Sequence, residues 1–403
     1  NHTVRMFYNK TLYRRIVGHD RPPATFEELV AVCEQVEAYA DSIGKPIFPI
    51  AASSYQTEHI RDIYSDALNA SIIPEVLDAR YDLNGRGYEK FLSYLDGRVS
   101  FDDPEVRAGE MIHRDLARYY QPGFMATNRQ EAGFAFAQQR ALMISSGSWD
   151  YQSMAVQARD NGFEIGVLPF PLPTADNPTY GKWVDGQIAE ENRTEVMFGL
   201  TRRSQHLDVA LTFLKFITSK KINEEVNAII GWIPSIRNTE VVEHMKPFLP
   251  QTEGIPPLHM PLTVVGGKFG KTWTTDAQRY WEFISGDIGY EEYIGAVEKR
   301  LVIDGMADMN QMLLEFEEGM LPMEHARSYY SVMRTFGDSE QMRADNAAKA
   351  VSVASGFVSR AFDHVDFGYR LYRITRDPAN PRTEQLVRIP EYRSFLDYYQ
   401  FEK

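Results

Sequence analysis

Short apolar runs alternate with amphipathic stretches along the first half of the chain. Residues 4–8 (VRMFY) and 45–51 (KPIFPIA) have the composition of buried strands. One helical face between them is formed by Phe26, Leu29, Val30, Cys33, Val36 and Ala40. Thr25 and Glu28 have the spacing of a capping box at the start of this helix, and Gly44 follows its end. Strands that alternate with helices predict an α/β layered domain.

Capping residues and spacing predict further helices. Residues 11–17 form a short helix that ends at Gly18, and Ser53 begins another helix after the second strand. Asp103 and Pro104 are typical of a helix start. The apolar stripe that follows them consists of Val106, Gly109, Ile112, Leu116 and Tyr119. A later helix has its expected buried stripe at Leu207, Ala210, Leu211, Leu214 and Ile217.

The stretch FAFAQQRALMISSGSWD, residues 134–150, is the centre of the pattern. It predicts a helix over 134–139 and a strand over 141–144, which ends in small residues before Trp149 and Asp150. Ligands of open α/β sheets bind beyond the carboxyl ends of the strands. An aromatic plane and a carboxylate at such an end indicate a binding pocket, although a buried tryptophan that closes a turn is the alternative.

The last third of the chain is richer in helical spacing. Helices are predicted over 275–285, 290–301, 306–318 and 343–365. The last of these carries a narrow seam suited to another helix, at Ala347, Val351, Ala354, Val358, Ala361 and Val365. A hairpin of two strands, 367–375 and 385–389, and a final helix over 392–401 are predicted after it.

Composition narrows the class of protein. The 403 residues carry a formal net charge of −13 and no compensating Lys/Arg block, which argues against nucleic-acid binding. No run of eighteen apolar residues is present, so no membrane span is predicted. The single cysteine, Cys33, excludes disulfides within the chain and argues against a cysteine-built metal site. Asn1 is not an initiator methionine, and we expect that the true N-terminus was removed or lies upstream.

Catalytic motifs are weak or missing. The nine histidines include no H-E-x-x-H motif, and no G-x-S-x-G is present, so neither zinc catalysis nor a serine hydrolase is supported. Residues 266–272 (GGKFGKT) resemble a P-loop, but three residues instead of four separate the glycine from Gly-Lys-Thr. We interpret this stretch as a flexible turn. Carboxylates are plentiful, and nothing in the sequence singles out a glycosidase pair.

Six motifs, in order and at approximate spacing, resemble one family. They are FYNKTLYRRIVG, PPATFEEL, AFAQQRALMISSGSWD, FEIGVLPFP, HLDVALTFLKFITS and GWIPS, which together extend from Phe7 to Ser235. The chain resembles the extracellular solute-binding proteins of ABC importers, in the carbohydrate-binding branch that includes maltose-binding protein. The resemblance implies a type II periplasmic-binding-protein fold, with two hinged lobes that close on a sugar.

The resemblance also implies a division of the chain. Residues 1–10 would be a strand that crosses between lobes, 11–183 the second lobe, 184–250 the return segment of the first lobe, 251–305 late helices that complete the cleft and second lobe, and 306–403 a C-terminal helix and hairpin extension. A strand of the first lobe is expected over 194–200. In this family about a hundred residues precede the crossing strand, in keeping with ~30 residues or more per βαβ unit. We therefore expect the first lobe to lack its N-terminal part.

Partners and location follow from the same resemblance. It implies a small-molecule carbohydrate as ligand and an ABC permease as partner, with no catalysis, cofactor or metal. We expect a monomer on the periplasmic or extracellular face of a bacterial membrane, lipid-anchored through an upstream N-terminus. Two alternatives stay open: a carbohydrate-active hydrolase with the same aromatic cleft, and a sensor or scaffold that works through the C-terminal extension. That extension is otherwise interpreted as a brace for the second lobe.

The candidate ligand-binding residues follow from the chemistry of sugars. Aromatic planes pack on the C–H faces of a sugar ring, and polar side chains hydrogen-bond its hydroxyls. The tryptophans at motif or cleft-facing positions are Trp149, Trp183, Trp232 and Trp273, whereas Trp281 is assigned to the core. Tyr55 is the other stacking candidate. Asp150 is the first choice as hydroxyl acceptor, followed by Ser148 and Asp185. Core packing or a satisfied turn is the alternative for each.

Overall fold

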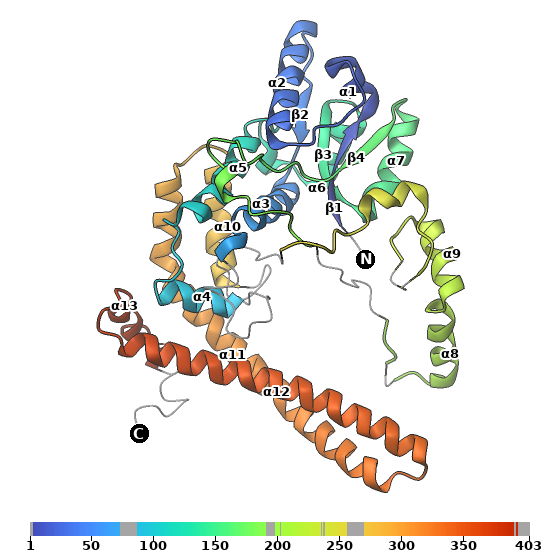
Figure 1. The fold of residues 1–403 in the computed structure, drawn as a ribbon, viewed down its shortest axis with the longest axis vertical. Helices are drawn as coiled ribbons and strands as arrows, with labels where there is room; N and C mark the ends of the chain where they lie inside the picture. The colour runs from blue at the N-terminus through green and yellow to red at the C-terminus, as the bar shows by residue number, and fades with distance from the viewer. Residues whose placement is uncertain are drawn as a thin grey trace. The chain divides into compact units, whose positions relative to one another are not determined.

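The computed structural model describes residues 3–72, 87–190, 198–201, 203–234, 236, 238–255, 270–390 and 392–393 (Figure 1). The chain divides into two compact units. The first unit comprises residues 1–71, 104–260 and 284–287, and the second comprises 72–103, 261–283 and 288–403. The predicted strand at 194–197, most of the P-loop-like stretch and most of the final helix lie outside the described residues.

A mixed four-stranded sheet forms the centre of the first unit. Its strands are β1 (Val4–Asn9), β2 (Phe48–Ala51), β3 (Ala141–Gly147) and β4 (Ile165–Leu168), in the order β2-β3-β1-β4. Strand β3 is parallel to β2, and β1 is antiparallel to both β3 and β4. The strands predicted at 4–8, 45–51 and 141–144 are confirmed, with β3 extending three residues further into its small residues.

The helices of the first unit, several of which pack on the sheet, complete the predicted α/β class, which is confirmed (Figure 1). They are α1 (Lys10–Val17), α2 (Phe26–Ile43), α3 (Ser54–Leu68), α5 (Pro104–Ala117), α6 (Arg129–Ala137), α7 (Tyr151–Asp160), α8 (Leu207–Ile217) and α9 (Lys220–Ile230). Short 3₁₀ turns lie at Ala70–Ile72, Phe124–Ala126, Ser148–Asp150, Gly181–Trp183 and Glu243–Phe248.

The ends of α2 show how local chemistry fixes a helix. The Thr25 hydroxyl accepts a hydrogen bond from the Glu28 amide, as predicted. The Glu28 carboxylate accepts a hydrogen bond from the amide of Ala24, 2.7 Å away. In a regular capping box the donor would be the amide of Thr25, one residue later. At the other end Gly44 has φ +62°, a left-handed conformation that glycine adopts without steric cost.

The core of the first unit lies where the sheet meets α6 and α7. Phe7 and Ile144 face each other across β1 and β3, and both are buried. Phe136, Phe163 and Phe248 join them in one apolar cluster. Burying large aromatic side chains supplies about 1.5–3 kcal/mol each, so this cluster anchors the strands whose ends carry the candidate site.

Helix α3 is fixed to α5 by a buried ion pair. The Arg61 guanidinium donates to both Glu110 oxygens, at 3.0 and 2.6 Å, and both side chains are buried. His113, one turn after Glu110 on α5, lies 2.9 Å from the Tyr120 hydroxyl. Burial, together with the charge of Arg61, lowers the pKa of His113 from 6.5 to about 3. The imidazole is therefore neutral at physiological pH.

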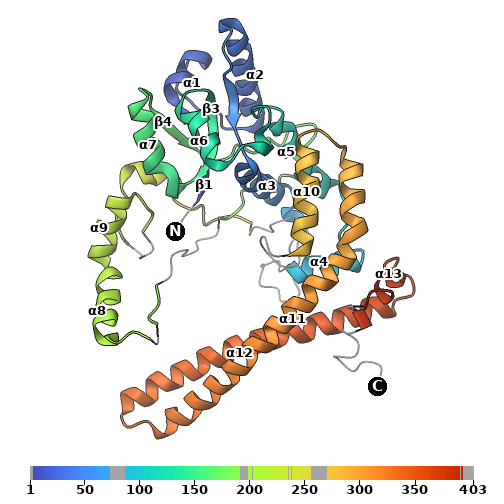
Figure 2. The same cartoon turned by 180° about the vertical axis from the view of Figure 1, so that it is seen from behind.

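The described part of the second unit is helical. It contains α4 (Gly87–Leu95), α10 (Lys271–Ile284, apart from its last residue), α11 (Tyr290–Phe336), α12 (Glu340–Arg376) and α13 (Thr383–Val387). Helices α11 and α12 lie side by side as a long antiparallel hairpin (Figures 1 and 2). The helices predicted at 275–285, 290–301, 306–318 and 343–365 fall almost entirely within α10, α11 and α12.

Several predictions of secondary structure and burial differ from the structure. The hairpin predicted at 367–375 and 385–389 is helical, because Phe367, Leu371 and Ile374 bury one helical face of α12. The helix predicted over 134–139 is α6, which begins earlier, at a capping box between Asn128 and Glu131. The predicted buried stripe of α8 is not buried: Leu207 and Leu211 are 48% and 45% exposed, because no described segment covers that face. In the strand predicted over 194–200, the described residues 198–200 have no regular structure.

Candidate functional site

The carboxyl ends of β2 and β3 lead into the segments that carry the site. Strand β2 is followed by Ser53, whose hydroxyl accepts a hydrogen bond from the Tyr55 amide and caps α3. Strand β3 is followed by the Ser148–Asp150 turn and then by α7. Because β2 and β3 are parallel neighbours, both ends lie at the same edge of the sheet. This topology brings Tyr55 and Trp149 together, although 94 residues separate them in the sequence.

An aromatic cluster forms at this edge, and we define it as Tyr55, His59, Trp149, Arg129 and Asp150. The His59 ring lies 4.7 Å from the Tyr55 ring and 6.4 Å from the indole of Trp149, centroid to centroid. The Arg129 guanidinium lies 4.4 Å from the centroid of Tyr55, which is cation–π geometry. Tyr55, His59, Trp149 and Asp150 are each half-buried, so their faces remain accessible.

Two side chains orient Asp150. Its carboxylate accepts hydrogen bonds from the Arg129 guanidinium and from the hydroxyl of Ser146. An ionised carboxylate has about four acceptor positions, so capacity is left for further donors. Burial raises the pKa of Tyr55; the charge of Arg129 opposes this and that of Asp150 adds to it. The phenol therefore stays protonated and can donate a hydrogen bond.

Gly147 determines where the Trp149 ring lies. A Cβ atom at position 147 would collide with the far edge of the indole. The ring therefore lies directly against the backbone at the end of β3. Because Gly147 has φ −92°, its requirement comes from this close approach and not from an unusual backbone conformation.

A cavity of about 460 Å³ lies beside the aromatic cluster and shares His59 with it. Residues of α3 line one wall, including Asp62 and Asp66. Other walls come from the start of β1, from Pro169 and Phe170 after β4, and from residues 187–190. This volume is within the 300–1,000 Å³ typical of small-molecule sites. Apolar walls with several carboxylates suit a polar ligand that donates hydrogen bonds.

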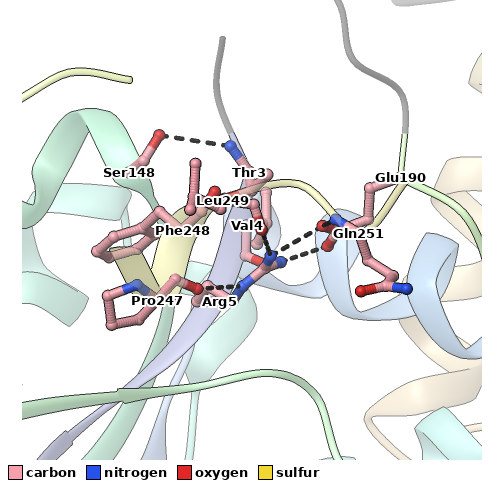
Figure 3. Close-up of polar contacts among 9 residues, drawn as sticks. All are labelled: Thr3, Val4, Arg5, Ser148, Glu190, Pro247, Phe248, Leu249 and Gln251. Atoms are coloured by element: carbon pink, nitrogen blue, oxygen red, sulfur yellow. Dashed lines mark hydrogen bonds and ion pairs between the residues drawn. The ribbon is translucent and has the colours of Figure 1, made fainter. Parts of the chain in front are cut away.

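Arg5 joins three segments at the opposite wall of this cavity (Figure 3). Its guanidinium donates to both carboxylate oxygens of Glu190 and to the carbonyl oxygens of Val4, Pro247 and Leu249. All five N–H groups of the arginine are used. The Gln251 amide also bonds Glu190, at 2.8 Å. Arg5 therefore has a structural role, since no donor is left for a ligand.

The other predicted site residues lie elsewhere. Ser148 is buried and bonded to Thr3: its hydroxyl is 3.4 Å from the Thr3 amide, and its own amide bonds the Thr3 carbonyl (Figure 3). Trp183 is half-buried beneath the Lys182 ammonium, 4.2 Å from its ring, and Asp185 is exposed. Trp232 is 38% exposed after α9. Trp273 lies on α10 in the second unit, as does Trp281, which is half-buried rather than deep in the core.

Three residues of the site escape the sequence analysis: His59, Arg129 and Ser146. His59 is one helical turn after Tyr55, and residues four apart on a helix lie on the same face. Arg129 is the first residue of α6, directly after the capping residue Asn128. The capping-box spacing of Asn128 and Glu131 was the available signal for the start of that helix. Nothing in the sequence, however, indicates that Arg129 lies over Tyr55.

The structure argues against a phosphate site in the P-loop-like stretch. Its last residues begin α10, where the carboxylate of Asp308 accepts hydrogen bonds from the amides of Lys271 and Thr272 and from the Thr272 hydroxyl, at 2.7–2.9 Å. A carboxylate thus holds the position where a helix N-terminus would bind an anion. Within the described ranges, no group of three or more His, Cys, Asp or Glu side chains could hold a metal ion. None of the described helices is both long and apolar enough to span a membrane.

Comparisons with known proteins converge on one class. The model of the family described as "Bacterial extracellular solute-binding protein" matches residues 1–247, more than half of the chain. The "Multiple sugar-binding protein" of Streptococcus mutans is 22% identical over 230 residues, which are 56% of this chain and 47% of that protein. The chain thus spans about half the length of this curated relative.

Solved structures are similar at lower identity. A "Chitin oligosaccharide binding protein" is 16% identical with a TM-score of 0.49, covering 75% of this chain and 70% of that one. The structure "SBP RafE in complex with raffinose" is 13% identical with a TM-score of 0.48, covering 75% of this chain and 71% of that one. Both TM-scores are below 0.5.

Proposed function

Because the chain belongs to the family of bacterial extracellular solute-binding proteins, we propose that it is a carbohydrate receptor of an ABC importer. The observation that carries the proposal is the aromatic cluster at the carboxyl ends of β2 and β3. It combines what a sugar requires: rings for its C–H faces, and a carboxylate with a guanidinium for its hydroxyl edge.

Each member of the cluster has a separate role in the proposal. The indole of Trp149 stacks on a ring face of the sugar, and Tyr55 covers its edge and donates through its hydroxyl. Asp150 accepts from sugar hydroxyls with the oxygen positions that Arg129 and Ser146 leave open. His59 belongs to the cluster and also lines the adjoining cavity, where Asp62 and Asp66 are further hydrogen-bond acceptors. A second sugar unit would enter this cavity.

The remaining parts of the proposal rest on the family resemblance. Ligand binding favours a closed form of the two lobes, because the closed form has the higher affinity. The receptor works on the outer face of the bacterial membrane, attached there by a lipid anchor, and delivers its ligand to a membrane permease. It does not catalyse a reaction. Trp183, Trp232, Trp273 and Asp185 stay candidates for contacts in the closed form.

A thermal-shift screen of the purified protein against mono- and oligosaccharides, uronic acids and polyols tests the proposal. A ligand at a hundred times its dissociation constant adds about 2.7 kcal/mol of stability. For a protein of this size the unfolding midpoint then rises by roughly several degrees. The part of the intrinsic tryptophan fluorescence change that is absent in Trp149→Ala reports on the cluster.

Matched variants separate binding from folding. Trp149→Ala should remove the sugar-induced shift while the protein without sugar still unfolds cooperatively. Phe134→Ala removes a 57% exposed aromatic ring from α6 outside the cluster, and it should leave the shift unchanged. Absence of any shift with every sugar tested would contradict the proposal. Release of smaller sugars from an oligosaccharide by the pure protein would instead support a hydrolase.

A further inference from the structure

Helix α12 carries an exposed apolar seam along most of its length. The seam consists of Ala344, Ala348, Val351, Ser355, Val358, Phe362, Val365 and Tyr369, and every one of these residues is exposed. The spacings alternate between four and three, which is the heptad pattern of a coiled coil. The larger members Val351, Val358 and Val365 are 69%, 63% and 63% exposed.

The seam is distinct from the face of α12 that contacts α11. On that inner face Gly356 lies against Met323, and the ring of Phe357 lies beneath the guanidinium of Arg327. Val358 follows Gly356 by two residues, which places it about 200° around the helix. Of the seam expected from the sequence, Ala347, Ala354 and Ala361 are half-buried, whereas its valines are exposed. Among the described residues, α12 therefore has two apolar faces, of which α11 contacts one.

Size complementarity indicates that the seam can pair with itself. In an antiparallel coiled coil, each layer combines one residue from each helix. With a twofold axis midway between Val358 and Phe362 on the seam, one layer pairs Val351 with Tyr369 of a second copy. The next layers pair Ser355 with Val365 and Val358 with Phe362. Each layer joins a smaller residue to a larger one, as close packing requires.

Charge complementarity selects this register. In it, Asp345 lies opposite Arg373 of the second copy, and symmetry repeats the pair at the other end of the seam. Both residues are exposed, although Asp345 also accepts a hydrogen bond from Gln341 at 2.8 Å. A shift by one heptad would instead place Asp345 opposite Asp366, and like charges at such flanking positions disfavour pairing.

We propose that the outer seam of α12 is a dimerisation surface for a second copy of this chain, packed antiparallel about a twofold axis that crosses the seam midway between Val358 and Phe362. Such a contact is isologous, so it closes at two copies and does not extend into a fibre. The dimer replaces the monomer expected from the family resemblance. It uses the second unit alone and is independent of sugar binding.

Analytical ultracentrifugation of the full chain tests the proposal. The unmodified protein should sediment as a dimer that dissociates on dilution. Val358→Glu combined with Val365→Glu should give a monomer with unchanged helix content. Val332→Glu is the matched control, because Val332 is a 55% exposed valine on α11 outside the seam, and it should leave the dimer intact. A monomer at every concentration would overturn the proposal, as would equal dissociation by the control.

Disulfide trapping tests the register. The native cysteine, Cys33, is buried, so an engineered thiol can be followed alone. The proposed axis places Ser359 beside Ser359 of the second copy, and Ser359→Cys should form a covalent dimer under mild oxidation. Ser352→Cys lies two helical turns away and should not. Trapping through position 352 in preference to 359 would contradict the register and the charge argument behind it.

Discussion

Arg5 and Glu190 form a bidentate ion pair across 185 residues of sequence, in which Nη2 of Arg5 lies 2.8 Å from Oε2 of Glu190 (Figure 3). Strand β1 is thereby fixed to the segment at 187–190, and the carbonyls of Pro247 and Leu249 attach a third segment to the same guanidinium. One buried arginine therefore fixes the segments that form one wall of the cavity beside the aromatic cluster.

Arg5→Met should lower the free energy of unfolding by about 2–3 kcal/mol, because Glu190 and three carbonyl oxygens lose a charged donor. Urea denaturation at neutral pH measures the difference. Arg14→Met is the control, since the Arg14–Asp20 ion pair is exposed and solvent screening should leave it with little effect on stability. Equal losses of unfolding free energy in the two variants would mean that the buried network stabilises the fold no more than an exposed ion pair does.

Gly147→Ala should displace the indole of Trp149 from the end of β3, since the added methyl group occupies the position of the ring. The near-ultraviolet circular dichroism and the tryptophan emission should change, and any sugar-induced thermal shift should weaken. Gly133→Ala makes the same substitution in α6, where nothing lies within 4 Å of the new methyl group. That control should gain stability, by about 0.5–1 kcal/mol. Unchanged spectra in Gly147→Ala would refute the packing described for Trp149.

Acid should destabilise the first unit through His113. Its pKa is about 3 in the folded protein against an ordinary value of 6.5, so between these values the unfolded chain binds a proton that the folded chain does not. The free energy of unfolding therefore falls as the pH drops through this window, by at most about 1.4 kcal/mol per pH unit. His113→Gln removes the titrating group and keeps a donor for Tyr120. Denaturation curves at pH 7, 6 and 5 should show a shallower decline for the variant, and parallel declines would contradict the assignment.

Asp308→Ala should destabilise the second unit by about 1–2 kcal/mol, because three hydrogen bonds at the start of α10 are lost. Thermal unfolding followed by circular dichroism measures the effect. Asp308 lies on α11. Glu315→Ala removes an exposed carboxylate from α11 and should have little effect on stability. Similar losses for both variants would show that the cap at Thr272 is unimportant.

Local patterns were sufficient to predict three of the four strands and several of the helices beside them. Thr25, Gly18 and Gly44 mark helix ends through their own backbone chemistry, so the sequence around them is informative. The same holds for β1 and β3, whose apolar runs are buried on both sides. Tyr55 and Trp149 were both predicted as stacking residues of one cleft, and the structure brings them to one edge because β2 and β3 are parallel.

Predictions failed where tertiary packing overrides local preference. The segment 367–375 is rich in residues favoured in strands. In the structure, however, the ring of Phe367 packs against Tyr88, and the Tyr88 hydroxyl donates a hydrogen bond to Asp363. These contacts favour a helix that packs against α4. Arg129 and His59 escaped for a different reason. Their roles depend on side-chain contacts between α3, α6 and the end of β3. The spacing of residues along one element does not predict such tertiary contacts.

The close fit of the indole against Gly147 has an entropic consequence. Trp149 is held by the backbone beneath it, and Arg129 is held by Asp150, before any ligand is present. Immobilising a mobile side chain costs a binding reaction about 0.5–1.5 kcal/mol. Because these side chains are already ordered, a ligand would lose little affinity to that cost, and a single sugar ring could be retained with few contacts.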